Sequence, residues 1–235
     1  MSLKPLLPSL YELRLGLVNA FLIDDPAGAV LIDTGYPGQA DRIVKGLNGA
    51  GKEAQDVRDI LVTHCHGDHS GSAAEMKRRT GARLAMHPLD ADMVRRGKTQ
   101  RPWAPTPGLF NRALYELFVK PAPKQIEPTE TDVELDDGQL LPVAGGLRVV
   151  HAPGHCAGQT ALLWQRHGGV LFSGDAAMNT PWLRPAIVYE DLELGLATLA
   201  KLAALPFEHA CFGHGRPMLG GAAQRLRLRF GRAEI

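Results

Sequence analysis

The sequence of 235 residues carries almost no net charge, because 26 lysine and arginine residues are balanced by 25 aspartate and glutamate residues. Nucleic-acid-binding proteins usually carry a strong positive field, so this balance argues against a nucleic-acid partner. Apolar runs are short, and none reaches the roughly 18 residues that a membrane-spanning helix needs. Pro5 and Pro8 interrupt the stretch where a signal peptide would have its apolar core. We therefore expect a cytoplasmic protein with neither a membrane nor a nucleic acid as its partner.

Cysteine is scarce, and Cys65, Cys156 and Cys211 are widely spaced along the chain. An odd number of cysteines without CxxC spacing forms neither a disulfide framework nor a structural zinc site. We interpret all three as small apolar residues that pack in the core. The GxSxG motif of serine hydrolases is also absent, so chemistry at a serine nucleophile is not indicated.

Apolar runs and turn residues predict two halves, each with strands followed by a helix. The predicted strands cover 18–23, 29–32, 60–62, 82–86, 133–135, 140–144, 147–151, 160–164, 169–172 and 209–212, and the predicted helices cover 39–47, 70–80, 109–119 and 192–205. Residues 88–128 hold seven of the 17 prolines and predict an inserted cap. The simplest arrangement is one domain over residues 1–235, with sheets inside and helices outside.

One segment, from Thr63 to Gly71, concentrates side chains of the kinds that bind metals. It contains the motif HxHxDH, formed by His64, His66, Asp68 and His69. The motif follows the predicted strand 60–62 and opens a predicted helix, which is where α/β folds place active sites. His64 and His66, two apart in extended chain, can both point to one side, whereas Asp68 and His69 lie in the turn and can reach a neighbouring point, so the motif indicates two metal ions side by side.

Three further ligand-type residues lie in the second half, and each has a glycine beside it. His155, Asp175 and His214 all follow closely after the end of a predicted strand. A single histidine in such a place is more often a hydrogen-bonded surface residue than a ligand. Three such residues together with HxHxDH make up a set large enough for two metal ions.

These motifs and their order resemble those of the metallo-β-lactamase-fold hydrolases, and the resemblance covers nearly the whole chain. It implies an α/β (α+β) fold, a four-layer αββα sandwich with the cap of residues 88–128 inserted in it. It also implies two Zn²⁺ ions per chain, with iron or manganese possible in one or both sites. One ion would take His64, His66 and His155, the other would take Asp68, His69 and His214, Asp175 would bridge the two, and Asp33 would hold the ligand loop by hydrogen bonds.

The resemblance implies a hydrolase in which a hydroxide shared by the two metals attacks the carbonyl of a small-molecule ester, thioester or lactone. Asp68 is placed to accept a proton from the bound water. Glyoxalase II enzymes share the metal motifs, whereas Met178 replaces a tyrosine of the quorum-quenching lactonases. Two alternatives remain: β-lactam hydrolysis as a side activity, and a persulfide dioxygenase of the same fold that holds one iron with His64, His155 and Asp175.

Several residues outside the ligand set are candidates for other roles. A substrate pocket is predicted from Trp103, Met178, Trp182 and Tyr189. A basic cluster is interpreted as a solvated helix end, and it consists of Arg95, Arg96, Lys98 and Arg101. Four histidines fall outside the ligand set, and they are His87, His151, His167 and His209. We expect His167 to be solvated in a turn, and His87 and His151, which end strands, to have structural roles.

Overall fold

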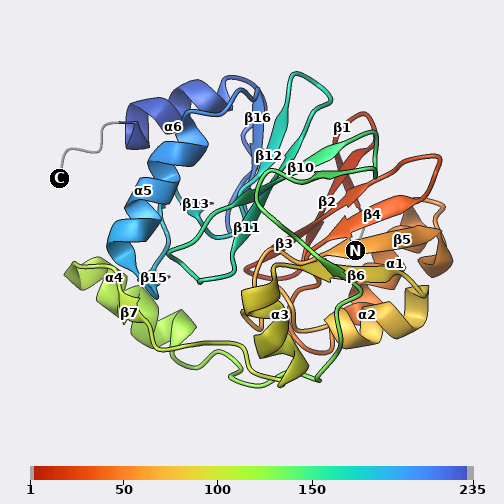
Figure 1. The fold of residues 1–235 in the computed structure, drawn as a ribbon, viewed down its shortest axis with the longest axis horizontal. Helices are drawn as coiled ribbons and strands as arrows, with labels where there is room; N and C mark the ends of the chain where they lie inside the picture. Colours follow the sequence, from red (N-terminus) through yellow and green to blue (C-terminus); the bar gives the residue numbers. More distant parts are fainter. Residues whose placement is uncertain (1–2, 232–235) are drawn as a thin grey trace.

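The computed structural model describes residues 3–231. Two β-sheets pack face to face, and helices cover the outer face of each sheet (Figure 1). The order of layers is therefore helix, sheet, sheet, helix, and the predicted four-layer α/β sandwich is confirmed. Among the described residues, no helix combines the length and the apolar character that crossing a membrane requires.

The first sheet has seven strands in the order β1-β2-β3-β4-β5-β6-β8. They are β1 (Lys4–Leu7), β2 (Leu10–Arg14), β3 (Asn19–Ile23), β4 (Ala29–Ile32), β5 (Val57–Leu61), β6 (Arg83–Met86) and β8 (Val133–Glu134). Strands β1 to β4 pair antiparallel, whereas β4, β5, β6 and β8 pair parallel. The parallel strands therefore place their carboxyl ends at one edge of the sheet.

The second sheet has five strands in the order β16-β12-β11-β10-β9. They are β9 (Leu140–Leu141), β10 (Leu147–His151), β11 (Thr160–Trp164), β12 (Val170–Phe172) and β16 (His209–Cys211). Two short pairs flank the sandwich: β13 (Ala177–Asn179) with β14 (Leu183–Pro185), and β7 (Ala104–Pro105) with β15 (Val188–Tyr189). Strands β10, β12 and β16 run in one direction, so their carboxyl ends also share an edge.

The helices bury one apolar face each. On the first sheet pack α1 (Ala40–Gly49), α2 (Ala73–Thr80) and α3 (Pro88–Arg95), and on the second α5 (Leu192–Ala203) and α6 (Ala222–Phe230). Helical spacing points Ile43 and Leu47 of α1 inward, and Leu199 and Leu202 of α5 likewise. As the sequence predicts, α2 ends at Gly81, whose φ of 67° lies in the left-handed region.

The central core lies between the two sheets and draws side chains from both. The rings of Phe21 and Phe172 lie 5.5 Å apart across this interface. The indole of Trp164 is almost fully buried, and its Nε1 donates to the carbonyl of Ala144 at 2.7 Å. The two sheets therefore share a continuous apolar interface, and this interface fixes the relative position of their edges.

We expect Phe172→Ala to lower the free energy of unfolding by about 3–5 kcal/mol, because it removes a large ring from this interface and leaves a cavity. Urea denaturation of the purified protein measures the loss. Leu228→Ala is the matched control, since Leu228 is 80% exposed on α6 whereas Phe172 is 1% exposed. Equal losses in the two variants would show that the interface does not hold the sheets together.

The segment predicted as an insertion, 88–128, divides into two parts. Its first residues form α3, whose Ala91 and Val94 are buried in the core beneath the first sheet. The remainder carries β7, α4 (Leu109–Leu114) (Figure 1) and the π-helical turn η2 (Tyr115–Val119). None of these three elements has a buried residue. The sequence also predicted no element for β1, β2 or α6, although all three belong to the sandwich.

Candidate metal centre

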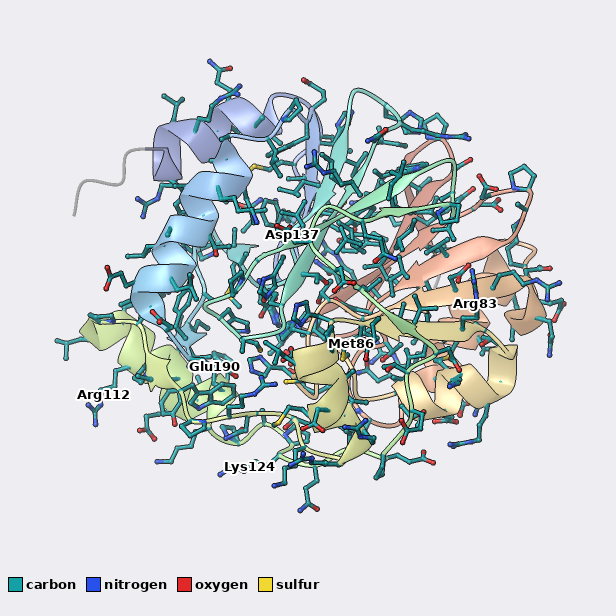
Figure 2. The ribbon with its side chains drawn as sticks, viewed as in Figure 1. Arg83, Met86, Arg112, Lys124, Asp137 and Glu190 are labelled. Carbon is teal, nitrogen blue, oxygen red and sulfur yellow. The ribbon has the colours of Figure 1, made fainter. Side chains whose placement is uncertain are left out.

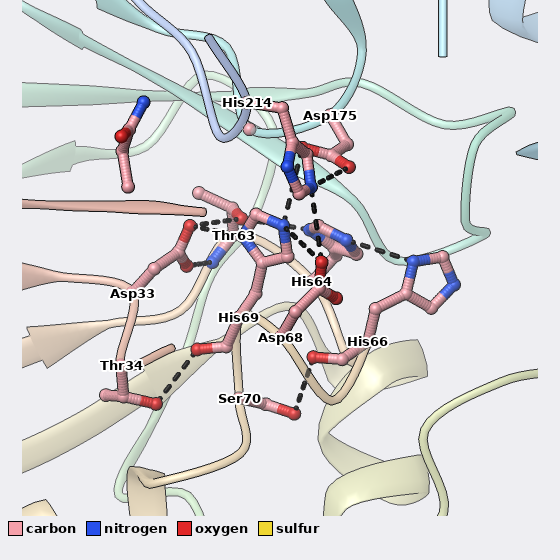
Figure 3. Close-up of polar contacts among 12 residues, drawn as sticks. Asp33, Thr34, Thr63, His64, His66, Asp68, His69, Ser70, Asp175 and His214 are labelled. Carbon is pink, nitrogen blue, oxygen red and sulfur yellow. Dashed lines mark hydrogen bonds and ion pairs between the residues drawn. The ribbon is translucent and has the colours of Figure 1, made fainter. Parts of the chain in front are cut away.

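The predicted metal ligands and Asp33 lie at the adjoining edges of the two sheets (Figure 3). The HxHxDH loop joins β5 to α2, and Asp33 follows β4. His155, Asp175 and His214 follow β10, β12 and β16 of the second sheet. The carboxyl ends of parallel strands share an edge, so residues far apart in sequence meet at one place.

Three imidazoles form the first group of ligand atoms. His64 Nε2 lies 3.1 Å from His66 Nδ1, and His155 Nε2 lies 2.9 Å from the same atom. All three side chains are buried. Their ring nitrogens therefore converge on a single small volume, as the resemblance implied for one metal ion.

The second group consists of one carboxylate and two imidazoles. Asp68 Oδ2 lies 3.2 Å from His214 Nε2 and 3.8 Å from His69 Nε2. Asp175 stands between the groups, because its Oδ1 is 3.4 Å from His69 Nε2 while its Oδ2 is 3.2 Å from His214 Nε2 and 3.8 Å from His155 Nε2. The structure thus brings all seven predicted ligands together.

In His155 and His214, hydrogen bonds from the ring nitrogen that faces away from the centre determine which nitrogen faces the centre. Nδ1 of His155 donates to the carbonyl of Val188 at 2.8 Å, and Nδ1 of His214 donates to the carbonyl of Leu17 at 2.7 Å. A carbonyl can only accept, so in the neutral ring the Nε2 lone pair must point inward. Histidine ligands of metals are commonly held by such outer hydrogen bonds.

Asp33 orients the histidines of the HxHxDH loop by hydrogen bonds in the same way. Its Oδ2 accepts from Nδ1 of His69 at 2.8 Å and from the hydroxyl of Thr63 at 3.0 Å. The Thr63 oxygen in turn lies 3.0 Å from Nδ1 of His64. Asp33 itself adopts a φ of 62°, a left-handed conformation that aspartate tolerates better than most residues. It supports the ligands without facing the cavity.

The donor set fits divalent metal ions. Nε2 of His69 and Oδ1 of Asp175 are buried and have no hydrogen-bond partner among the described residues. Burial by itself lowers the pKa of His214, yet Asp175 and Asp68 raise it to about 10. The same negative field that attracts a proton also attracts a cation, which competes with protons for these nitrogens. Imidazole and carboxylate ligands suit zinc, iron or manganese.

A second cluster, not foreseen from the sequence, joins the two ligand loops. The buried carboxylate of Asp90 on α3 accepts from the backbone N–H of Cys65 at 2.9 Å and of Gly158 at 3.1 Å. Arg101 Nη1 donates to Asp90 at 2.8 Å and to Glu190 at 3.2 Å. Arg101 is therefore part of a largely buried ion-pair network, and the interpretation of this residue as a solvated helix end is wrong.

We expect Asp90→Asn to weaken metal binding by roughly 10–100-fold, because asparagine has one acceptor oxygen and the loops carrying His66 and His155 would lose a shared anchor. A competition titration with a coloured chelator measures this affinity. Asp92→Asn on the same helix removes only exposed ion pairs to Arg95 and Arg96 and should leave the affinity unchanged. Wild-type affinity in Asp90→Asn would contradict the anchoring role.

An apolar cavity of about 250 Å³ opens above the ligands. His66, Asp68, His155, Asp175 and His214 form its floor. Most of the cavity wall is apolar, and it comes mainly from the 98–125 segment and the β13–β14 hairpin. Its apolar residues include Trp103, Phe110, Leu114, Phe118, Val119, Met178, Pro181 and, just after the hairpin, Ile187. A concave apolar site with a few converging polar groups is the usual form of a small-molecule site.

The predicted pocket residues divide between the wall and its surroundings. Trp103 and Met178 line the cavity, and the indole of Trp103 packs 4.8 Å from the ring of His66. Trp182 is 58% exposed and stacks on Phe110 outside the wall, while Tyr189 is buried against His155. The aromatic content of this region could be read from sequence, but the direction of each ring depends on how the hairpin folds.

Tyr36 is a cavity residue that the sequence did not single out. Burial and the nearby Asp68 carboxylate raise the pKa of its phenol to about 12. The hydroxyl is therefore protonated at neutral pH and available as a hydrogen-bond donor. Only its place in the turn after Asp33, near the predicted ligands, could have suggested it.

The cysteines are all buried, as expected of core residues. Cys156 nevertheless touches the centre, because its Sγ lies 3.3 Å from Nε2 of His66. Burial raises the pKa of the Cys156 thiol well above its ordinary value, so the thiol stays protonated. Of the other histidines, His87 and His151 stack on each other at 4.3 Å, apart from the ligand groups.

A sandwich of this topology, with imidazoles and carboxylates gathered at its strand ends, defines a metal-dependent hydrolase. The family model described as "Metallo-beta-lactamase superfamily" matches residues 13–214. The chain therefore belongs to the metallo-β-lactamase superfamily.

Relatives agree with this assignment. The chain is 27% identical to a probable metallo-hydrolase, YflN of Bacillus subtilis (strain 168), over 89% of this chain and 85% of that protein. It is 26% identical to the atrochrysone carboxyl ACP thioesterase nsrC of Aspergillus novofumigatus, over 91% of this chain but only 52% of that protein. A metallo-β-lactamase structure from Cronobacter sakazakii superposes with a TM-score of 0.72 at 22% identity, over 92% and 81% of the two chains, and it shows the shared fold.

Proposed function

We propose that the protein hydrolyses an ester, thioester or lactone of an apolar small molecule at a centre of two divalent metal ions. Zinc is the metal that we propose for both sites. The observation that carries this proposal is the meeting of seven candidate ligand side chains at one place, five of which form the floor of an apolar cavity. His64, His66 and His155 would hold one ion. Asp68, His69 and His214 would hold the other, with Asp175 shared (Figure 3). Bound ions of this kind polarise a carbonyl oxygen and lower the pKa of water to near 7.

Asp68 is the residue placed to move a proton. It lines the cavity, and its carboxylate is less buried than that of Asp175. Burial alone would raise the pKa of Asp68, but the imidazoles of His69 and His214 hold it well below its usual range. The ionised carboxylate can therefore accept a proton from the attacking water and deliver it to the leaving group.

The cavity wall supports the choice of an apolar substrate. Burial of an acyl chain or an aromatic ring against Trp103, Phe110 and Met178 would contribute binding free energy roughly in proportion to the apolar area removed from water. The name of the fungal relative, a thioesterase, supports thioesters as the first compounds to examine.

Hydrolysis rates on a panel of thioesters, lactones and β-lactams, with metal content measured on the same sample, test this function. We expect two divalent ions per chain and turnover of a thioester, an ester or a lactone. One iron per chain with oxygen uptake on a glutathione persulfide would instead establish the dioxygenase, and turnover of β-lactams alone would establish a lactamase. A fully loaded protein that hydrolyses none of these compounds would contradict the proposal.

A further inference from the structure

The cavity wall contains one arginine that the hydrolytic chemistry does not use. Arg184 lies on β14 and pairs with Met178 across the β13–β14 hairpin, so both side chains face the cavity. Only 6% of Arg184 is exposed. The sequence did not indicate Arg184 as a cavity residue, because it lies outside the basic cluster at 95–101 and in no recognisable motif.

The guanidinium of Arg184 has no acidic partner among residues 3–231. Its Nη2 donates to Oδ1 of Asn111 on α4, and its central carbon lies 5.5 Å from the ring centroid of Phe110. These contacts use one of its five N–H donors within the described part of the chain. By contrast, the partly buried Arg101 has both Asp90 and Glu190 as partners.

A buried arginine without a carboxylate is costly, because the guanidinium stays charged in proteins even when burial lowers its pKa, as it does here. The stacking on Phe110 and the bond to Asn111 offset part of this cost and hold the planar group in one orientation. A charge fixed in this way on the wall of a ligand cavity is suited to bind an anion that arrives with the substrate.

We propose that Arg184 binds a carboxylate of the substrate, at a distance from the carbonyl that is hydrolysed. This inference rests on the proposed hydrolysis, and it makes the substrate an apolar ester, thioester or lactone that carries one further carboxylate. The fork of a guanidinium matches a carboxylate with two parallel hydrogen bonds. A single negative charge fits better than a phosphate, since Arg184 is the only lysine or arginine among the residues that line the described cavity and the acidic residues there belong to the metal centre.

Equilibrium binding tests the inference without any turnover. Calorimetry on the metal-loaded protein compares 4-phenylbutanoate with its neutral amide, in wild type and in Arg184→Gln. We expect Arg184→Gln to weaken binding of the carboxylate by about tenfold or more and to change binding of the amide much less. Arg184→Lys keeps the charge without the fork and should lie between the two. Equal weakening of both compounds, or no weakening, would overturn the inference.

Arg112→Gln is the matched control, because it removes the same charge from α4. The side chain of Arg112 extends from the outer side of the helix into solvent (Figure 2). It does not line the cavity, so its substitution should leave both affinities unchanged. A comparable loss in Arg112→Gln would show that a general field, rather than contact with Arg184, attracts the carboxylate.

Kinetics separate this inference from the proposed function. Two S-phenyl thioesters of octanedioic acid are compared, one with a free carboxylate at the far end and one with a methyl ester there. We expect wild type to favour the free carboxylate through a lower KM, and Arg184→Gln to lose that preference by about tenfold or more. Hydrolysis of both thioesters with an unchanged preference would refute only the role of Arg184. If neither is hydrolysed, the proposed function fails, and the calorimetry still decides on Arg184.

Discussion

Asp68→Asn is expected to lower kcat/KM for an activated thioester by at least about a thousandfold. Asparagine is nearly isosteric with aspartate, but it cannot accept the proton that we assign to this carboxylate. It also replaces an anionic ligand with a neutral one, so the group formed with His69 and His214 should bind its metal ion more weakly. Steady-state kinetics at saturating metal, together with metal analysis after dialysis, measure both effects.

The control for this substitution is Asp41→Asn, since the Asp41 side chain is 83% exposed on α1 and far in sequence from every ligand. It should retain wild-type turnover and metal content. If Asp68→Asn retained full turnover, Asp68 would be neither the proton acceptor nor a required ligand. A variant that keeps both ions but loses turnover would assign Asp68 to proton transfer alone.

Asp175→Asn is expected to reduce the metal content below two ions per chain and to abolish measurable hydrolysis. Among the described residues, Asp175 has the one carboxylate within 4 Å of histidine nitrogens from both ligand groups. Its loss removes the negative charge that offsets two adjacent cations, and their mutual repulsion would then expel one of them. Inductively coupled plasma mass spectrometry on dialysed protein gives the number of ions retained.

Glu193→Gln removes an exposed carboxylate from the first turn of α5 and should change neither quantity. Two ions per chain with wild-type turnover in Asp175→Asn would mean that the two groups hold their ions independently. Such a result would favour separate sites over the shared centre that we propose.

The seven proposed ligands could be predicted from the sequence because their positions depend on features that are local along the chain. HxHxDH places four ligand atoms within six residues, and His155, Asp175 and His214 each follow a strand end beside a glycine. The strands that precede these residues run parallel within each sheet, so their carboxyl ends share an edge. The proposed ligands that follow these strands therefore lie close together. The alternation of apolar runs with helical patterns predicted sheets inside and helices outside, and the resemblance of the motifs to a known family implied the four-layer sandwich.

The residues that the sequence did not reveal are defined by partners far along the chain. Asp90 acts on Cys65 and Gly158, and Arg184 meets Asn111 and Phe110 only because the hairpin folds against α4. No spacing rule connects such positions. The start of the insertion was misplaced for a related reason, since Pro88 opens α3 at its first turn and does not interrupt the α-helical layer.

Each proposed ligand group takes side chains from both halves of the chain. His155 joins His64 and His66, and His214 joins Asp68 and His69, so an ion in either place would link the first sheet to the second. Because unfolding would separate those ligands, the free energy of unfolding must rise with the concentration of free metal. Metal supply would then govern how much folded protein persists as well as how fast it works, and starvation for the ion would remove the enzyme by exposing it to proteolysis.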